Sequence, residues 1–226
     1  MTAFAPAQAD GARHRDIGLR FRAAEPGDAQ MCAPLVFESG VREFGFFLGE
    51  RDAHCIAFLT FAFQSRHGRF SWRRHRVGVA GDGTVLAVMA VQDGRRTMFD
   101  DVFVVLGLLR FFGPRRIVRR LLRGLVLESE LPAPKRSQSL IAHCATDERY
   151  RGRGIFSALL DDALRAGVLP LDRGSREVVL DVLTSNVRAR ALYERLGFVA
   201  QERPRLRSRW LPAELASIRM RLERRD

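Results

Sequence analysis

The pattern of apolar and polar positions is most regular in the last third of the chain. Ser139–Thr146 and Glu177–Leu183 are apolar runs of strand length. Gly152–Ala166 and Asn186–Leu196 repeat apolar residues at helical spacing, and a glycine follows each stretch. This strand–helix–strand–helix order predicts a central sheet flanked by helices.

Two further strands are expected beyond these elements, at Phe198–Glu202 and Ser217–Glu223. In the second of them, Ile218, Met220 and Leu222 alternate with charged neighbours. Such alternation is typical of a strand that buries one face.

The first quarter of the chain predicts a strand at Leu19–Ala23 followed by a helix. The segment Glu-Pro-Gly-Asp at 25–28 is typical of a turn that precedes a helix. A helix beginning near the end of this turn would carry three apolar residues toward the core, namely Met31, Leu35 and Val36.

A second helix and a hairpin are expected next. Asp52–Phe63 is rich in apolar residues and has the length of a helix. The runs Phe70–Ala80 and Thr84–Gln92 are rich in strand-forming residues, and the Gly-Asp-Gly turn at 81–83 between them is typical of a hairpin.

Residues 93–138 interrupt this order with a predicted helical insertion. Asp100–Phe112 is apolar nearly all round, and Pro114 suits the first turn of a new helix. In the segment Arg115–Val126, one helical face is predicted to carry Arg115, Arg116, Arg119, Arg120 and Arg123. The other face is predicted to carry Ile117, Val118, Leu121 and Leu125. We expect one domain at 19–226 that contains this insertion, after a flexible tail at 1–18.

Composition places the chain among ordinary globular proteins. Its 226 residues are 46% hydrophobic and 28% charged, and no apolar run is long enough to cross a bilayer. Residues 1–18 lack the apolar core of a secretory signal peptide. We therefore expect a cytoplasmic protein without a transmembrane segment.

The charge and the cysteines restrict the possible ligands. The net charge is +12, and because Lys135 is the only lysine, nearly all of the positive charge is arginine. This field attracts anionic ligands, but no nucleic-acid-binding motif is present, so no specific nucleic-acid partner is indicated. Cys32, Cys55 and Cys144 have neither disulfide-framework nor metal-ligand spacing, so no metal site is expected.

The segment 149–156, between a predicted strand and a predicted helix, has the features of a phosphate cradle. The first N–H groups of a helix have no internal partner, and glycines let the backbone approach an anion closely. The segment offers Gly152 and Gly154 together with Arg149, Arg151 and Arg153. The alternative is a glycine-rich surface turn with solvated arginines. The segment is neither a P-loop nor a dinucleotide fingerprint.

With a second block downstream, the cradle resembles the GNAT N-acetyltransferase superfamily. The family's cofactor motif, Arg/Gln-x-x-Gly-x-Gly/Ala, is matched by the segment from Arg151 to Phe156. The family's Asn-x-x-Ala-x-x-Leu-Tyr-x-x-x-Gly-Phe pattern is matched by Asn186, Ala189, Leu192, Tyr193, Gly197 and Phe198. The resemblance covers about residues 139–203. Phe156 replaces a small residue of the motif, so its ring is expected to point into the helix–sheet interface.

The resemblance implies a fold, a cofactor and a set of contacts. The fold would be α/β (α+β), with a mixed, mostly antiparallel sheet in which two strands splay apart, and acetyl-CoA would be the co-substrate. Backbone groups of Cys144 and Thr146 and the side chain of Asn186 would contact the pantetheine arm or the thioester. The pyrophosphate would bind the main-chain N–H groups of Arg151, Gly152, Arg153, Gly154, Ile155 and Phe156.

The implied activity is direct transfer of an acetyl group to a primary amine in a ternary complex. Tyr193 would give a proton to the departing thiolate; the alternative is a buried tyrosine whose hydroxyl is simply satisfied. His143 is the candidate base, with Asp181, Glu38 or a water chain as alternatives. Cys144 lacks an activating His/Asp pattern and is interpreted as a packing residue.

Two different functions fit these features. The first is a catalytic N-acyltransferase acting on a small-molecule or peptide amine. The second is a non-catalytic, CoA-binding module that docks on an anionic membrane or a nucleic acid through the basic helix 115–126. A lid or homodimer contact is the other interpretation of that helix.

Overall fold

The computed structural model describes residues 17–169, 177–202 and 208–223. The tail expected at 1–18 lies, apart from its last two residues, outside the described residues. The helices are α2 (Ala29–Glu38), α3 (Val41–Leu48), α4 (Asp52–Phe63), α5 (Thr97–Phe112), α6 (Pro114–Glu128), α7 (Ile155–Arg165) and α8 (Val187–Arg195). None of the helices in this part of the chain has the length and apolar character that a membrane span requires.

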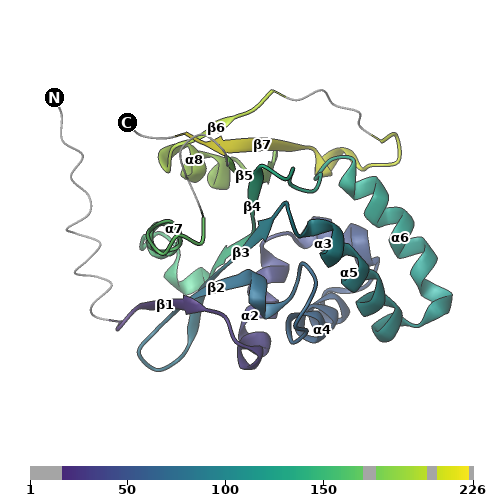
Figure 1. Ribbon diagram of the computed structural model, residues 1–226, viewed down its shortest axis with the longest axis horizontal. Coiled ribbons are helices and arrows are strands. Elements are labelled where there is room, and N and C mark those ends of the chain that lie inside the picture. Colours follow the sequence, from purple (N-terminus) through teal and green to yellow (C-terminus); the bar gives the residue numbers. More distant parts are fainter. Residues whose placement is uncertain (1–16, 170–176, 203–207, 224–226) are drawn as a thin grey trace.

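A seven-stranded sheet runs through the molecule in the order β1-β2-β3-β4-β5-β7-β6 (Figure 1). Its strands are β1 (Arg20–Ala23), β2 (His75–Val79), β3 (Val85–Asp93), β4 (Gln138–Thr146), β5 (Glu177–Leu183), β6 (Phe198–Ala200) and β7 (Ser217–Leu222). Only β4 and β5 are parallel neighbours among these strands; the other pairs are antiparallel. The predicted fold class, a mostly antiparallel sheet flanked by helices, is confirmed.

Apolar residues on opposite faces of the sheet form two separate clusters. Along β3, Val88 belongs to the cluster that contains residues of α2 and α4, whereas Ala87 and Met89 belong to the cluster that contains residues of α7 and α8. Successive strand residues point to opposite faces, so β3 is buried on both sides. In Figure 1, α7 and α8 lie on one side of the sheet and α2 to α6 on the other.

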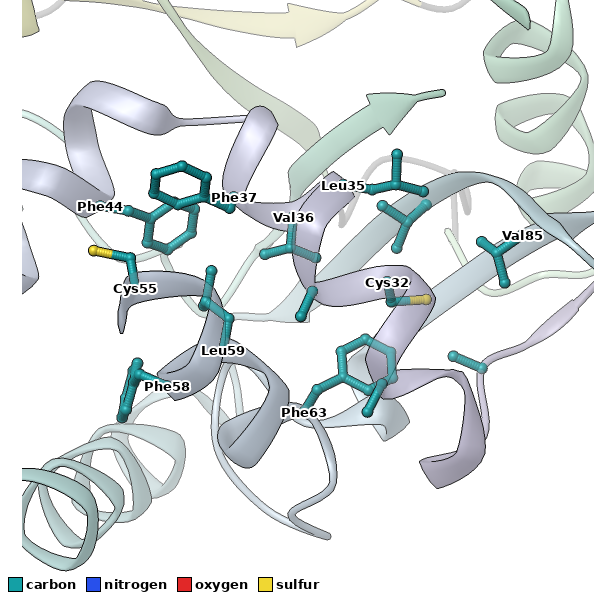
Figure 2. Close-up of a cluster of buried hydrophobic side chains, with 14 of the residues drawn as sticks. Cys32, Leu35, Val36, Phe37, Phe44, Cys55, Phe58, Leu59, Phe63 and Val85 are labelled. Atoms are coloured by element: carbon teal, nitrogen blue, oxygen red, sulfur yellow. The ribbon is translucent and has the colours of Figure 1, made fainter. Parts of the chain in front are cut away.

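Figure 2 shows the first of these clusters, in which side chains from α2, α3 and α4 pack together. The helix α2 buries Ala29, Cys32, Ala33 and Val36, which recur at helical spacing. Met31 was expected in this core but is 40% exposed. The prediction was wrong because Met31 lies on the side of α2 opposite the buried stripe.

A short helix that the sequence pattern did not predict follows α2. It spans Val41–Leu48, and it ends at Gly49, whose φ of 63° is in the left-handed region that favours glycine. Eight residues are too few for a clear helical repeat to stand out. The junction between α2 and α3, at Ser39 and Gly40, brings the start of α3 close to the open end of the sheet.

Two predicted boundaries shift for local reasons. The predicted strand Phe70–Ala80 begins only at His75, because Trp72–Arg74 forms a 3₁₀ turn. The helix predicted from Gly152 begins at Ile155, because Gly152 and Gly154 have φ values of 75° and 74°.

The segment predicted as an insertion contains the helices α5 and α6, but the faces of α6 differ from the prediction. Arg120, expected on the arginine face, is buried, pairs with Glu50 and places its guanidinium 3.8 Å from the centre of the Phe112 ring. Val118 and Leu125, expected on the apolar face, are 63% and 66% exposed. The difference arises because α6 turns its side with Ile117, Leu121 and Gly124 toward the first cluster and α3.

Candidate active site

The parallel strands β4 and β5 separate partway along their length. Their pairing runs from Gln138 opposite Glu177 to Ile141 opposite Leu180. Both strands continue beyond this point, β4 to Thr146 and β5 to Leu183. The sheet therefore has the splayed strand pair that the sequence resemblance implied, and the opening is lined by the ends of two strands.

A β-bulge at the start of this opening changes which way the side chains of β4 point. Val88 of β3 lies opposite Ala145, whereas Ala90 lies opposite Ala142, so Met89 faces two residues of β4 instead of one. One of these is His143, whose φ is 53°. As a result, His143 contacts the aromatic rings of the first cluster, while the next residue, Cys144, packs on the α7 side.

The opening forms a cavity of about 890 Å³ between the cradle, the ends of β4 and β5, α8 and the α2–α3 junction. Nine of the eleven residues proposed from the sequence line it: Cys144, Thr146, Arg151, Gly152, Gly154, Ile155, Phe156, Asn186 and Tyr193. Arg153 and His143 are not among its lining residues. We call this space the cofactor cavity.

The backbone of the cradle has the geometry of an anion site. Gly152 and Gly154 both adopt positive φ, and Gly154 is the residue that precedes α7. The first N–H groups of α7 have no partner within the helix. They point out of its N-terminus, which is the positive end of the helix dipole. A Cβ built on Gly152 would meet no atom within 4 Å among the described residues. This backbone therefore fits a pyrophosphate group.

The arginines of the cradle mainly hold the loop. Arg151 Nη2 lies 3.0 Å from Glu38 Oε2, and its Nε donates to the Thr146 carbonyl at 3.0 Å. The backbone N–H of Arg151 donates to the Glu148 carbonyl at 3.3 Å, so the exposed N–H groups begin at Gly152. The Arg153 guanidinium lies 5.2 Å from the centre of the Tyr150 ring.

Other arginines, which the sequence pattern did not reveal, line the cofactor cavity. Arg42 comes from α3, and Arg188 and Arg195 come from α8. The two on α8 are seven positions apart, a spacing that places them on one face of the helix. That spacing is the signal that could have identified them.

Tyr193 is buried where the opening is lined by β4 and α8. Its hydroxyl lies near the Cys144 thiol, and burial raises the pKa of Tyr193 well above its usual value. Burial also raises the pKa of Cys144 to about 12, so its thiol stays protonated. A protonated thiol is a poor nucleophile, which agrees with a packing role for Cys144.

Phe156 and Asn186 have defined positions beside Tyr193. The Phe156 ring is buried at the helix–sheet interface, as expected, with its centre 6.1 Å from that of Tyr193. The Asn186 side-chain oxygen accepts a hydrogen bond from the Ala189 N–H at 3.1 Å and so caps α8. Its amide nitrogen is the part of the side chain not used by this cap.

A second cavity of about 610 Å³ lies on the other side of the opening, between the sheet and helices α3, α5 and α6. We call it the apolar cavity, because phenylalanine, leucine and valine side chains form most of its wall. His143 lines it. Residues lining both cavities are Ser39, Gly40, Glu43, Asp181 and Leu183. The two cavities therefore adjoin at the splayed strands.

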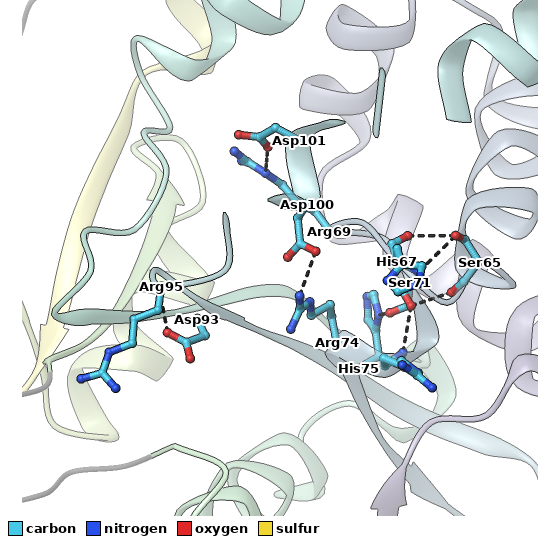
Figure 3. Close-up of polar contacts among 11 residues, drawn as sticks. Ser65, His67, Arg69, Ser71, Arg74, His75, Asp93, Arg95, Asp100 and Asp101 are labelled. Carbon is cyan, nitrogen blue, oxygen red and sulfur yellow. Dashed lines mark hydrogen bonds and ion pairs between the residues drawn. The ribbon is translucent and has the colours of Figure 1, made fainter. Parts of the chain in front are cut away.

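Hydrogen bonds determine which nitrogen atoms of His75 and His143 carry protons. His75 Nδ1 lies 2.8 Å from the Ser71 carbonyl oxygen, which can only accept, so Nδ1 carries a proton (Figure 3). Burial lowers the pKa of His75 to about 4, so its Nε2 is an acceptor at neutral pH. His143 Nδ1 lies 3.0 Å from this atom and donates to it. His143 Nε2 is therefore left with a lone pair.

The surroundings of His143 favour its neutral form. Burial lowers the pKa of His143 well below its usual value, and His75 and Arg69 act in the same direction. The ring is stacked on Phe70, with centres 5.4 Å apart and an angle of 18° between planes. A neutral, fixed imidazole can accept a proton at Nε2.

The carboxylates near the opening differ in their partners. Asp181, an alternative base, receives hydrogen bonds from Arg219 on both oxygens, at 3.0 and 2.7 Å. Glu38, the other alternative, pairs with Arg151. Glu43, which the sequence pattern did not single out, forms no ion pair with any of the described residues, and burial raises its pKa. Glu43 lies where the two cavities adjoin.

Ion pairs hold the insertion over the apolar cavity (Figure 3). Arg74 lies 2.8 Å from Asp100, and Arg69 lies 2.6 Å from Asp101, in the first turns of α5. Arg69 also lies 3.5 Å from Glu128 near the end of α6. Both helices of the insertion are thus tied to the body of the fold.

Comparisons with known proteins agree with this architecture. Residues 106–198 match the Acetyltransferase (GNAT) family. Over 63 residues, the chain is 43% identical to the N-alpha-acetyltransferase MAK3 of Arabidopsis thaliana. That alignment covers 28% of this chain and 32% of the relative, so the chain spans about a third of the length of the curated protein it matches.

Solved structures share the fold at low sequence identity. A protein described as an acetyltransferase has a TM-score of 0.62 at 19% identity, over 90% of this chain and 98% of that chain. An N-acetyltransferase from Staphylococcus aureus Mu50 has a TM-score of 0.61 at 17% identity, over the same shares of the two chains. The family match, the two sequence motifs and the splayed sheet together identify a GNAT acetyltransferase region within this chain, at residues 106–198.

Proposed function

We propose that this protein transfers an acetyl group from acetyl-CoA to a primary amine within a ternary complex. The observation that carries the proposal is the meeting of two cavities at the splayed strands. One contains a glycine-built anion site and a buried tyrosine hydroxyl, and the other contains a neutral histidine. Transfer between two bound substrates requires such adjoining sites, because it depends on their close and oriented approach.

The cofactor cavity would hold CoA mainly through backbone groups. N–H groups from Gly152 to Phe156 would bind the pyrophosphate, and Arg42, Arg188 and Arg195 would add positive charge around the cavity. Backbone groups of Cys144 and Thr146 and the amide nitrogen of Asn186 would contact the pantetheine arm. Acetyl-CoA supplies an acyl group that is activated as a thioester.

Two side chains would handle protons on opposite sides of the opening. Tyr193 stays protonated because burial raises its pKa, so its hydroxyl can donate a proton to a departing thiolate. His143 Nε2 has a lone pair and can accept a proton from the amine. Glu43 lies at the junction and can balance the charge of an ammonium group before it loses that proton.

The experiment that tests this proposal is a thiol-release assay with acetyl-CoA and a panel of primary amines. Amine-dependent release of CoA, together with the mass of an acetylated product, is expected. Tight CoA binding in isothermal titration without turnover on any amine would contradict the catalytic proposal and favour a non-catalytic binding module.

A second candidate role is docking on an anionic lipid surface, and the insertion favours it. The exposed side of α5 presents an apolar stripe at helical spacing that consists of Phe99, Val102, Phe103, Leu106 and Leu109. The same two helices also expose arginines, namely Arg110 of α5 and Arg115, Arg116 and Arg119 of α6. Apolar side chains bordered by cations are typical of interfacial helices.

Vesicle sedimentation tests this second role. Binding to vesicles that contain phosphatidylserine, lost in Phe99→Asp/Leu106→Asp, is expected if the stripe enters the lipid interface. Equal sedimentation with neutral and anionic vesicles, or a dimer that buries the stripe in solution, would contradict it.

A further inference from the structure

The apolar cavity has the dimensions and the walls of a small-molecule site. Its volume of about 610 Å³ lies within the range typical of ligand pockets. Apolar side chains from separate elements converge on it, including Phe44 and Phe47 of α3, Phe70, Leu108 of α5 and Leu121 of α6. A ligand that fills this space must have an apolar body, because polar groups placed against these walls would lose their hydrogen bonds to water.

The charged groups around this cavity favour a cationic ligand over an anionic one. Arg69, which lies on its wall, is ion-paired with Asp101 and Glu128. Asp181 is ion-paired with Arg219. Glu43 is the carboxylate of the junction that forms no ion pair with any described residue. The carboxyl group left to meet a ligand is therefore Glu43, at the end next to the cofactor cavity. A cationic ligand placed there would favour its ionised form.

A buried acceptor lies toward the other end of the cavity. Gln92 of β3 is 4% exposed and lines the cavity, and its Oε1 has no hydrogen-bond partner among the described residues. Buried side-chain oxygens are normally hydrogen-bonded, and a small rotation of the Gln92 side chain would let this one accept from a donor on a ligand in the cavity.

Register along the sheet gives the distance between the two ends. Gln92 is opposite Leu140, and Met89 is opposite the bulge at His143. Gln92 and Val88 share a face of the sheet because they are four residues apart in a strand. Val88 belongs to the first cluster, and His143 contacts the aromatic rings of that cluster, so Gln92 and His143 lie on the same side of the sheet. Gln92 is three residue steps along the strand from Met89, which corresponds to about 10 Å.

We propose that the acceptor is a primary monoamine on an apolar body, with one hydrogen-bond donor about 10 Å from the amino nitrogen. This inference rests on the proposed function. The amino group would lie at Glu43 and His143, the body against the phenylalanine and leucine walls, and the donor at Gln92 Oε1. In the reaction, the amine nitrogen bonds to the acyl carbon and the carbon–sulfur bond breaks. The ammonium group first loses one proton to His143 Nε2, which returns it to solvent. The attacking nitrogen loses a second proton as the carbon–sulfur bond breaks; Tyr193 gives its proton to the sulfur and regains one from the nitrogen.

The first test is a series of phenylalkylamines with graded chain length, each with and without a phenolic hydroxyl, assayed with acetyl-CoA. The specificity kcat/KM is expected to be highest for a hydroxylated amine of the length that places its hydroxyl roughly 10 Å from nitrogen. It should exceed the values for spermidine and for free lysine at least about tenfold, because a second charge would have to enter the apolar cavity.

The second test uses matched glutamine variants. Gln92→Leu should raise the KM of the hydroxylated amine about tenfold more than that of the amine without a hydroxyl. Titration of the hydroxylated amine without acetyl-CoA should give the same loss of affinity. Gln64→Leu, at an exposed position after α4, should behave as wild type in both measurements.

A third pair of variants tests the walls rather than the polar end. Leu121→Trp fills part of the cavity and should weaken the binding of the longer amines more than that of the shorter ones. Leu122→Trp is the control, because the neighbouring Leu122 is 58% exposed and does not line the cavity.

The outcomes separate this inference from the function on which it rests. Thiol release that is fastest with spermidine or lysine, or equal for all chain lengths, would overturn the acceptor class and leave the acetyltransferase proposal in place. No thiol release with any amine would remove the acetyltransferase proposal. In that case titration decides: binding of the hydroxylated amine that Gln92→Leu weakens supports the apolar-amine site, and no binding overturns it.

Discussion

The two cavities that meet at the splayed strands are built in different ways. The cofactor cavity depends on backbone geometry, with positive φ at Gly152 and Gly154, the start of α7 and the separation of β4 from β5. The apolar cavity depends on side chains that come from β3, β4, α3, α5 and α6. A site made of backbone needs particular residues at consecutive positions, whereas a site made of side chains tolerates many combinations. The first therefore leaves a motif in the sequence and the second does not.

The largest effect is expected from a substitution in the backbone-built site. Gly154→Glu would place a side chain on a positive-φ residue and a negative charge at the anion site. Isothermal titration should show a loss of CoA affinity of at least about 100-fold.

Gly167 provides the matched control for this substitution. It also has positive φ, at 66°, but it follows α7 at an exposed position. Gly167→Glu should carry similar backbone strain and keep CoA affinity within about twofold. Equal losses in both variants would mean that strain, not the anion site, explains the result.

The next largest effect should appear where the two cavities adjoin. Tyr193→Phe removes a hydroxyl that is protonated at neutral pH, and kcat should fall about 100-fold because the departing thiolate loses its proton donor. CoA affinity should stay close to that of wild type. An unchanged kcat would remove Tyr193 from the mechanism.

A stability effect should arise from the helix that covers the apolar cavity. Arg120→Ala leaves Glu50 without its buried partner and should lower the free energy of unfolding by about 4 kcal/mol. Arg119→Ala, at an exposed position of α6, should change it by less than about 0.5 kcal/mol.

The two kinds of cavity should also respond differently to Arg120→Ala. In enzyme that remains folded, the KM for the amine should rise while CoA affinity is retained. A loss of CoA affinity as large as the rise in KM would show that the cavities do not behave as separate sites.

A pH effect should follow from the buried histidine next to His143. The pKa of His75 is about 4 in the folded protein and about 6.5 when unfolded, so between these values the unfolded chain binds the proton more readily. The contribution of neutral His75 to the free energy of unfolding should therefore be fully present above about pH 6.5. It should fall by about 3 kcal/mol as the pH decreases to 4.

Urea unfolding of wild type and His75→Gln across this pH range measures the effect. The difference between their pH slopes isolates His75 from the carboxylates that titrate in the same range. His67→Gln, at an exposed histidine, should keep the wild-type slope. Parallel curves for wild type and His75→Gln would contradict the buried neutral state.

The fold and the loop geometry at 149–156 were predictable because their signals are local, whereas anion binding there stays a prediction. Helical spacing, strand-length apolar runs and glycines at helix ends lie within single segments, so the last third of the chain could be assigned from its sequence. The same holds for the cradle, whose glycines and arginines lie side by side between Arg149 and Phe156.

The remaining features depend on distant contacts. Arg120 is buried because Glu50 and the Phe112 ring receive it, and nothing in the arginine pattern of α6 distinguishes it from Arg119. Glu43 and Gln92 reach the apolar cavity only after α3 and the insertion pack against the sheet. The bulge at His143 depends on the register between β3 and β4, which the sequence of either strand alone does not determine.

The most direct test is a crystal structure with bound CoA. We expect the pyrophosphate on the N–H groups that begin at Gly152 and the thiol within hydrogen-bonding distance of the Tyr193 hydroxyl, facing the apolar cavity. CoA bound elsewhere, or side chains of the protein itself occupying the anion site, would contradict it.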